Sequence, residues 1–203
     1  MRYFSQGLFF CLFYLLTTSG CLLDNPPKST RSPMIDGRAE EYSQLSVEPI
    51  VLADEVNLYV YQNAHYVWLA YDYPPGSYGT LDMHLLTETL ATPLNLHVSA
   101  QLGQWTVGDT LSRPQTPTSD RWWNHIGWIS NPLWANGIDT LTYTVPQYNL
   151  KNGEAREIQL SKAHFGRGIY KVRLYVNAIK DRDGHFYSLV YPSDSTYLQI
   201  TVQ

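Results

Sequence analysis

The sequence predicts an all-β protein: one β-sandwich of about nine antiparallel strands with a long tryptophan-rich loop. Three observations indicate this. From Val56 onward, apolar and polar residues alternate with the period of two that puts successive side chains on opposite faces of a strand. Glycine, proline and asparagine separate these short runs, and no long segment keeps an apolar stripe at helical spacing. Many short strands of this kind, divided by turn residues, are typical of sandwiches.

The first 20 residues are expected to be a secretory signal peptide. One positive charge, Arg2, precedes an apolar run from Leu8 to Leu16. That run is about nine residues long, whereas a membrane-spanning helix needs roughly 20. The small residues Thr17 to Gly20 follow, as a signal peptidase requires. We therefore expect cleavage and export.

A single cysteine, Cys21, would remain after cleavage, because Cys11 leaves with the signal. Ser19-Gly20-Cys21 resembles the end of a bacterial lipobox, in which the cysteine is acylated, although Thr18 stands where leucine is usual. The resemblance implies a lipid-anchored protein of the cell envelope, on the outer membrane of a Gram-negative bacterium. The alternative is ordinary cleavage near Gly20, which leaves a free thiol.

Residues 21–34 are expected to form a tether, and residues 35–203 the folded domain. The tether has three prolines and few large apolar side chains, so it cannot bury enough surface to fold. The thirteen residues from Leu22 to Met34 reach roughly 40 Å when extended. That length suffices to hold a domain clear of a bilayer.

The amino-acid composition restricts the classes of ligand that the protein is expected to bind. The chain carries a net charge of −4, and this mild acidity disfavours nucleic acid, whose phosphates require a basic face. Only 16% of residues are charged, whereas there are 16 tyrosines and 6 tryptophans. Such a surface suits uncharged polar ligands such as sugars, although aromatic residues are also common in ordinary strands.

The expected strands follow from the alternation and from the turn residues between them. A break in the pattern spans residues 108–138, which carry four of the six tryptophans. Long ordered loops are uncommon and often functional. The expected strands cover residues 47–52, 56–61, 65–73, 80–87, 94–101, 140–145, 154–160, 170–180, 185–191 and 197–202.

Ile35-Asp36-Gly37 begins the domain, and Glu41 and Tyr42 follow it. Near the other end, a long alternating strand at 170–180 leads into an Asp-Gly turn. These features resemble family-nine carbohydrate-binding modules and the related DOMON-like sandwiches, in which tryptophan usually stands at the place of Tyr42. The resemblance implies sugar binding, often between two aromatic rings and sometimes with structural calcium, or haem binding in other members. It assigns no binding residue.

The first candidate site is the tryptophan-rich segment. Flat apolar rings suit the C–H faces of a pyranose, and amides suit its hydroxyl groups. The alternative is that the rings turn inward and close an open end of the sandwich. The candidate ligand-binding residues here are Trp122, Trp123, Asn124, Trp128 and Trp134, with Asn131 and Asn136 nearby.

The second candidate site follows from strand parity. Asp82 and His84 alternate with leucine and methionine, and His97 and Ser99 alternate with other apolar residues. Because the apolar residues face the core, all four polar side chains are expected on the outer face. A symmetric hairpin about residues 88–93 would put His84 opposite His97 and Asp82 opposite Ser99. Such a group could bind a polar ligand or a divalent metal. The alternative is a solvated polar face.

Three functions remain open. The first is a membrane-anchored, non-catalytic carbohydrate-binding module. The second is a structural or assembly lipoprotein that binds a partner protein. The third is a haem-binding or metal-binding electron-transfer module with Met83, His84 and His97 as ligands, although parity turns Met83 toward the core. No Gly-x-Ser-x-Gly motif is present, and residues 181–184 are typical of a hairpin turn more than of a calcium loop, so we expect no catalytic residue, metal or cofactor.

Overall fold

Strand β4 (Thr80–Leu86) shows how the alternating sequence builds the fold. Leu81, Met83 and Leu85 are at most 2% exposed, whereas Asp82 and His84 lie on the opposite face. The computed structural model describes residues 31–139 and 147–203, and describes side chains in 31–131 and 153–203. Within these ranges it has eleven strands in two antiparallel sheets, which confirms the predicted all-β sandwich.

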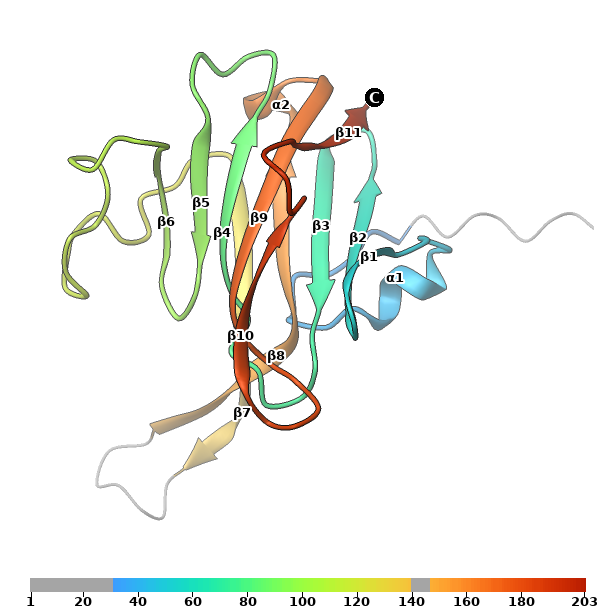
Figure 1. Ribbon diagram of the computed structural model, residues 1–203, viewed down its shortest axis with the longest axis vertical. Helices are drawn as coiled ribbons and strands as arrows, with labels where there is room; N and C mark the ends of the chain where they lie inside the picture. The colour runs from blue at the N-terminus through green and yellow to red at the C-terminus, as the bar shows by residue number, and fades with distance from the viewer. Residues whose placement is uncertain (1–30, 140–146) are drawn as a thin grey trace, which may run out of the picture. The chain divides into compact units, whose positions relative to one another are not determined.

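One sheet has five strands in the order β1-β2-β3-β8-β7, and neighbouring strands are antiparallel (Figure 1). Consecutive strands β1 to β3 form a meander, and β8 pairs with β3 from the other side. The strands are β1 (Ile50–Ala53), β2 (Val56–Gln62), β3 (Tyr66–Asp72), β7 (Trp128–Asp139) and β8 (Gln147–Ser161).

The other sheet has six strands, five of them in the order β10-β9-β4-β5-β6 (Figure 1). The sixth, β11, pairs with the first residues of β9, and β10 pairs with the last ones. Besides β4, its strands are β5 (Leu94–Val98), β6 (Leu102–Thr106), β9 (Gly168–Lys180), β10 (Phe186–Tyr191) and β11 (Leu198–Val202).

The region between β5 and β8 differs from the expectation. Residues 102–106 form β6, which has too few apolar residues for its alternation to be recognised. The expected loop ends at Gly127, because β7 begins at Trp128 and pairs with β8. The irregular segment is therefore 107–127 and not 108–138. The strand expected at 140–145 lies outside the described residues.

The main core lies between the two sheets. Leu58 and Leu69 come from one sheet, and Leu96 and Leu174 from the other, all at most 3% exposed. Met83 joins them at 0% exposure, so it lies on the opposite face of β4 from His84. Met83 and the two histidines therefore do not share one ligand position.

A smaller cluster covers the outer face of the five-stranded sheet. Tyr42, in the short helix α1 (Glu40–Gln44), packs with Trp68 and Ala70 of β3. β3 is thus buried on both faces, because Val67 and its alternate neighbours contribute to the main core. Figure 1 shows α1 beside β1 and β2.

The Asp36-Gly37 segment is attached to the sheet through a buried carboxylate. Glu157 of β8 is 0% exposed, and its Oε2 accepts N–H groups from Asp36 (2.8 Å), Gly37 (2.6 Å) and Arg38 (3.3 Å). Burial raises the pKa of Glu157 to about 7, although the backbone donors oppose that shift. The motif at the start of the domain therefore has a clear structural role.

The last strand is fixed by a buried lysine. Lys162, at the start of α2 (Lys162–Phe165), donates from Nζ to Gln62 Oε1 and to the carbonyl oxygens of Asn63 and Gln203. Desolvation and the charge of Arg167 lower its pKa. These three acceptors replace water around the ammonium group of a residue that is only 6% exposed.

The compact unit spans Ser32–Gln203. Ser32, expected in the tether, accepts a hydrogen bond from Asn63 Nδ2. The expected signal peptide, Cys21 and most of the tether lie outside the described residues. Among the residues that are described, none of the helices has the length and apolar character to cross a membrane.

Candidate functional site: a groove on the outer face of the six-stranded sheet

Four strands bring polar and aromatic side chains together on the outer face of the six-stranded sheet. The pairing aligns them in two rows, because β6, β5, β4 and β9 are neighbours. The first row is Trp105, Asn95, His84 and Arg173, and the second is Gly103, His97, Asp82 and Tyr175.

The hairpin register is shifted by two residues from the expected one. Asp82 lies opposite His97, and His84 lies opposite Asn95, so the predicted pairs His84–His97 and Asp82–Ser99 are wrong. A shift of two keeps every side chain on its predicted face, which is why parity could not exclude it. The expected outer-face placement of Asp82, His84 and His97 is confirmed.

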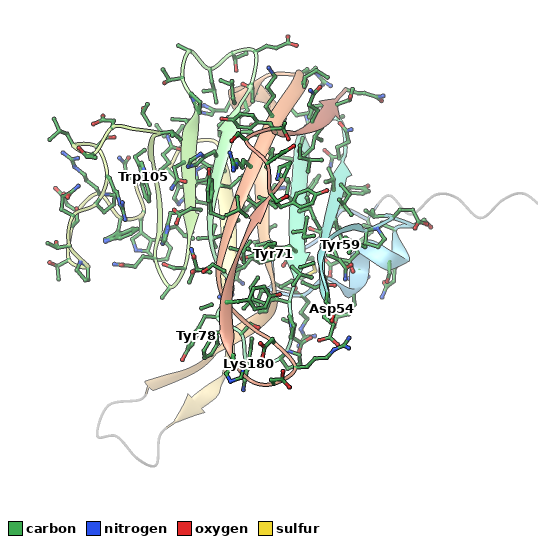
Figure 2. The ribbon with its side chains drawn as sticks, viewed as in Figure 1. Asp54, Tyr59, Tyr71, Tyr78, Trp105 and Lys180 are labelled. Carbon is green, nitrogen blue, oxygen red and sulfur yellow. The ribbon has the colours of Figure 1, made fainter. Side chains whose placement is uncertain are left out.

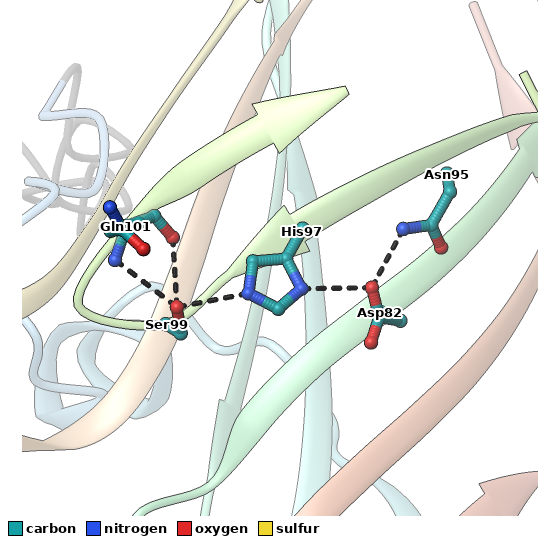
Figure 3. Close-up of polar contacts among 5 residues, drawn as sticks. All are labelled: Asp82, Asn95, His97, Ser99 and Gln101. Atoms are coloured by element: carbon teal, nitrogen blue, oxygen red, sulfur yellow. Dashed lines mark hydrogen bonds and ion pairs between the residues drawn. The ribbon is translucent and has the colours of Figure 1, made fainter. Parts of the chain in front are cut away.

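A hydrogen-bond chain runs along this face (Figure 3). Asp82 Oδ1 lies 2.9 Å from His97 Nδ1 and accepts Asn95 Nδ2 at 2.7 Å. His97 Nε2 lies 2.9 Å from Ser99 Oγ, which accepts the N–H of Gln101 at 3.1 Å. The chain joins β4 to β5 and fixes the orientation of the imidazole.

The order of atoms in Asp82, His97 and Ser99 is that of a hydrolase triad. However, Ser99 Oγ is bonded to both the N–H and the C=O of Gln101, which is a turn geometry. Ser99 and His97 also lie outside the groove lining. We interpret the series of hydrogen bonds through Asp82, His97 and Ser99 as structural.

Aromatic rings gather at the β6 side of this face. Trp122 folds back from the 107–127 segment, with its ring 5.2 Å from that of His97 and 6.4 Å from that of Trp105. Trp122 Nε1 donates to Thr116 O at 2.9 Å. Gly103 makes room for this ring, because a Cβ there would lie 3.3 Å from Trp122 Cε3. Figure 2 shows Trp105 on β6, the side where the segment folds back.

Beside these rings lies a groove of about 470 Å³, a volume in the range of small-ligand sites. It combines ring faces, two amides, one carboxylate and one guanidinium. Its lining residues are Asp82, His84, Asn95, Trp105, Val107, Gly108, Arg113, Tyr175 and Asn177.

The surroundings of Asp82 and His84 shift the pKa values of both groups. Burial acts to raise the pKa of Asp82, but its interactions with His97 and Asn95 outweigh it, and the pKa is lowered. Burial lowers the pKa of His84, and the charge of Arg173 adds to the effect. At pH 7 the groove therefore holds an ionised Asp82 beside a neutral His84.

Two buried polar atoms beside the groove have no hydrogen-bond partner among the described residues. They are Asn95 Oδ1, in a side chain that is 3% exposed, and Arg173 Nε. Both residues flank His84, on β5 and β9 respectively. A buried acceptor without a donor costs about 1–3 kcal/mol, so native proteins rarely leave one without a reason. A ligand hydroxyl would supply the missing donor at Asn95.

The predicted tryptophan-segment residues are spread over different surroundings. Trp122 is half-buried beside His97, whereas Trp123 is 59% exposed with a positive φ of 65°, and Asn124 is exposed. Trp128 is only 3% exposed and belongs to the main core. The backbone of Trp134 lies in β7, and its side chain lies outside the described part. Of the predicted tryptophan-segment side chains that the structure describes, only that of Trp122 lies against His97.

Asn131, the described one of the two amides expected near that segment, is not part of the groove lining. Asn131 Nδ2 donates to Ile35 O at 3.3 Å, at the start of the domain. Asn136 lies in β7, and its side chain is outside the described residues.

The sequence interpretation missed the residues that complete the groove. Tyr175 and Asn177 line the groove and Arg173 lies at its β9 margin. All three alternate with buried residues of β9, so the parity that selected Asp82 would have found them. Trp105 lies in a strand with no apolar run and gave no such signal. Asn95 and Arg113 also line the groove, and the sequence interpretation missed them too.

A larger hollow of about 800 Å³ lies elsewhere, among Glu55, Asp72, Glu154 and residues 73–77. Its central carboxylate, Asp72, already accepts hydrogen bonds from Asn57 and from the Tyr59 hydroxyl. None of the buried side-chain atoms without a partner belongs to the described residues of its lining. The groove is therefore the stronger candidate.

The turn considered for calcium is a hairpin turn. Asp181, Asp183 and His185 are exposed, with ligand atoms within 4.8 Å of one another. Asp181 Oδ1 accepts the N–H groups of Asp183 and His185, at 3.0 and 2.8 Å. These bonds shape the turn between β9 and β10.

No family model and no curated protein matches the chain. A solved structure from Bacteroides uniformis, provisionally assigned as a carbohydrate-binding protein, is similar over 79% of this chain and 88% of its own. The sequence identity is 13% and the TM-score is 0.39. At those values the likeness establishes neither fold nor ligand.

Proposed function

We propose that this protein binds carbohydrate in the groove on the outer face of the six-stranded sheet. The observation that carries the proposal is the convergence of ring faces and hydrogen-bonding groups around one buried, unpartnered acceptor, Asn95 Oδ1. The site binds its ligand and carries out no reaction.

The chemistry of a sugar ring fits this lining. One face of a pyranose presents C–H groups, which pack on flat aromatic rings, and its rim presents hydroxyl groups. Trp105 and Tyr175, on the two sides of the groove, offer the rings. Asp82, Asn95 and Asn177 offer acceptors and donors for the hydroxyls.

The site uses other tryptophans than the sequence hypothesis proposed. The exposed ring of Trp123 and the buried ring of Trp128 are left out. Trp122 takes a supporting role, because it packs against His97 and Trp105 without being part of the groove lining.

We also propose that the chain is exported and anchored through a lipid on Cys21. The apolar run after Arg2 and the Ser19-Gly20-Cys21 sequence support this. Metabolic labelling with a fatty acid tests it. Label should appear in the wild-type chain and be absent from Cys21→Ser, and equal labelling of the two would overturn the anchor while leaving the groove proposal intact.

The test of carbohydrate binding is a glycan array followed by calorimetry with wild-type protein, Trp105→Ala and Trp123→Ala. Removal of a stacking ring from a binding site costs about 1–3 kcal/mol, so Trp105→Ala should weaken binding at least tenfold. Trp123→Ala removes an equally large ring outside the groove and should bind like the wild type. Binding that survives Trp105→Ala, or native protein that binds no glycan, contradicts the proposal.

A further inference from the structure

Two guanidinium groups lie on the outer face at the groove, Arg113 in its lining and Arg173 at its margin. The chain has a net charge of −4, yet Arg113 and Arg173 form no ion pair with a described carboxylate. Arg182, by contrast, pairs with Asp54 and Glu55. Two unpaired guanidinium groups on one face of an acidic protein indicate a binding preference for anions.

Each guanidinium lies beside a ring of the groove. The carbon at the centre of the Arg113 guanidinium is 5.8 Å from the centre of the Trp105 ring, and that of Arg173 is 5.4 Å from the Tyr175 ring. Arg113 lines the β6 side, and Arg173 lies at the β9 margin, opposite His84. Three strand spacings separate β6 from β9, about 14 Å.

The negatively charged group in the groove already has hydrogen-bond partners. Asp82 is the one carboxylate in the lining, and its Oδ1 receives hydrogen bonds from Asn95 and lies 2.9 Å from His97. Arg173 Nε, buried and without a partner among the described residues, is a donor that requires an acceptor. A ligand carboxylate would satisfy it, because a guanidinium binds a planar carboxylate through two parallel hydrogen bonds.

We infer that the preferred ligand is an acidic sugar, a uronic acid residue within a glycan, whose carboxylate is bound by Arg113 or Arg173. This inference rests on the proposed carbohydrate-binding function and specifies its ligand. The pyranose ring packs on Trp105 or Tyr175, and a ring hydroxyl donates to Asn95 Oδ1. The spacing between β6 and β9 fits an oligosaccharide that crosses the sheet strands.

The experiment compares oligomers of galacturonate, glucuronate and mannuronate with their methyl esters, by calorimetry on the purified protein. The esters keep the rings and hydroxyl groups and lose the charge. At least one acid should bind tenfold or more tightly than its ester, and this preference should shrink as salt is raised. An ester that binds as well as its acid overturns the inference and leaves carbohydrate binding standing.

Variants that each remove one positive charge test which residues cause the preference for acid over ester. Arg113→Gln and Arg173→Gln should each reduce the preference for acid over ester at least threefold, and the double variant should abolish it. Lys171→Gln is the matched control, because Lys171 is exposed on the same face of β9 and lies opposite Leu86, one step away from the groove. An acid preference that Lys171→Gln lowers equally would overturn the assignment to the arginines. If no acid, no ester and no neutral glycan binds, the proposed function itself fails.

Discussion

Asp82 and His97 lie directly opposite each other on β4 and β5, with Asp82 Oδ1 2.9 Å from His97 Nδ1. Asp82 also accepts the Asn95 amide, so one carboxylate orients two neighbours of the groove. The arrangement makes Asp82 the structural centre of the outer face.

Asp82→Ala should therefore destabilise the fold. It leaves Asn95 Nδ2 and a ring nitrogen of His97 without their acceptor, at a cost of about 1–3 kcal/mol in the free energy of unfolding. Because the pKa of Asp82 is lowered, its contribution is present above pH 4 and is lost as pH falls through the lowered value. Urea unfolding at pH 7 measures the loss. Asp120→Ala, at an exposed loop position, is the control, and equal stabilities of the two variants would contradict the role of Asp82.

Ser99 should not react as a nucleophile. Its hydroxyl is bonded to the backbone of Gln101 on both sides, and His97 is covered by Trp122. A fluorophosphonate probe, which labels activated serines, is expected to leave the folded protein unmodified. Labelling that disappears in Ser99→Ala would show that the Asp82–His97–Ser99 chain is catalytic.

Gly103→Ala should weaken ligand binding without unfolding the protein. The added Cβ would lie 3.3 Å from Trp122 Cε3 and 3.5 Å from Trp105 Cζ3, and the first contact is close enough to displace the Trp122 ring. We expect a loss in affinity of roughly threefold to tenfold, which corresponds to about 1 kcal/mol. The loss should vanish in a Trp122→Ala background. An equal loss in both backgrounds would mean that Gly103 acts by another route.

Glu157 should make stability depend on pH. Its pKa of about 7 in the folded protein lies above the ordinary 4.5, so the folded state holds the proton more tightly. The wild type should be most stable below pH 4.5 and lose up to about 3 kcal/mol relative to Glu157→Gln as pH rises through 7. Urea unfolding at pH 5 and pH 8 measures this. Glu154→Gln, an exposed change on the same strand, should leave the difference in stability between pH 5 and pH 8 as it is in the wild type.

Much of the fold was predictable because a period of two assigns each side chain to a face. Leu81, Met83 and Leu85 are buried and Asp82 and His84 face outward, as the alternation indicates. The strand bounds near β4, β9 and β11 follow for the same reason.

Register and irregular chain were less predictable. Parity allows any even shift, so it could not distinguish the His84–His97 pair from the observed Asp82–His97 pair. Trp105 lies in a strand whose neighbours, Gly103 and Gln104, have no apolar pattern. Trp122 and Trp123 are adjacent in sequence, yet a positive φ at Trp123 sends them to different surroundings, and nothing in their residue types predicts that turn.

The most direct measurement follows the six indole N–H signals by nuclear magnetic resonance during titration with the best array ligand, each assigned by single tryptophan replacement. We predict a saturable shift of the Trp105 signal, with those of Trp68 and Trp128 unchanged because both rings are buried and lie outside the groove lining. A bound glycan that shifts Trp123 and leaves Trp105 unmoved would contradict this prediction.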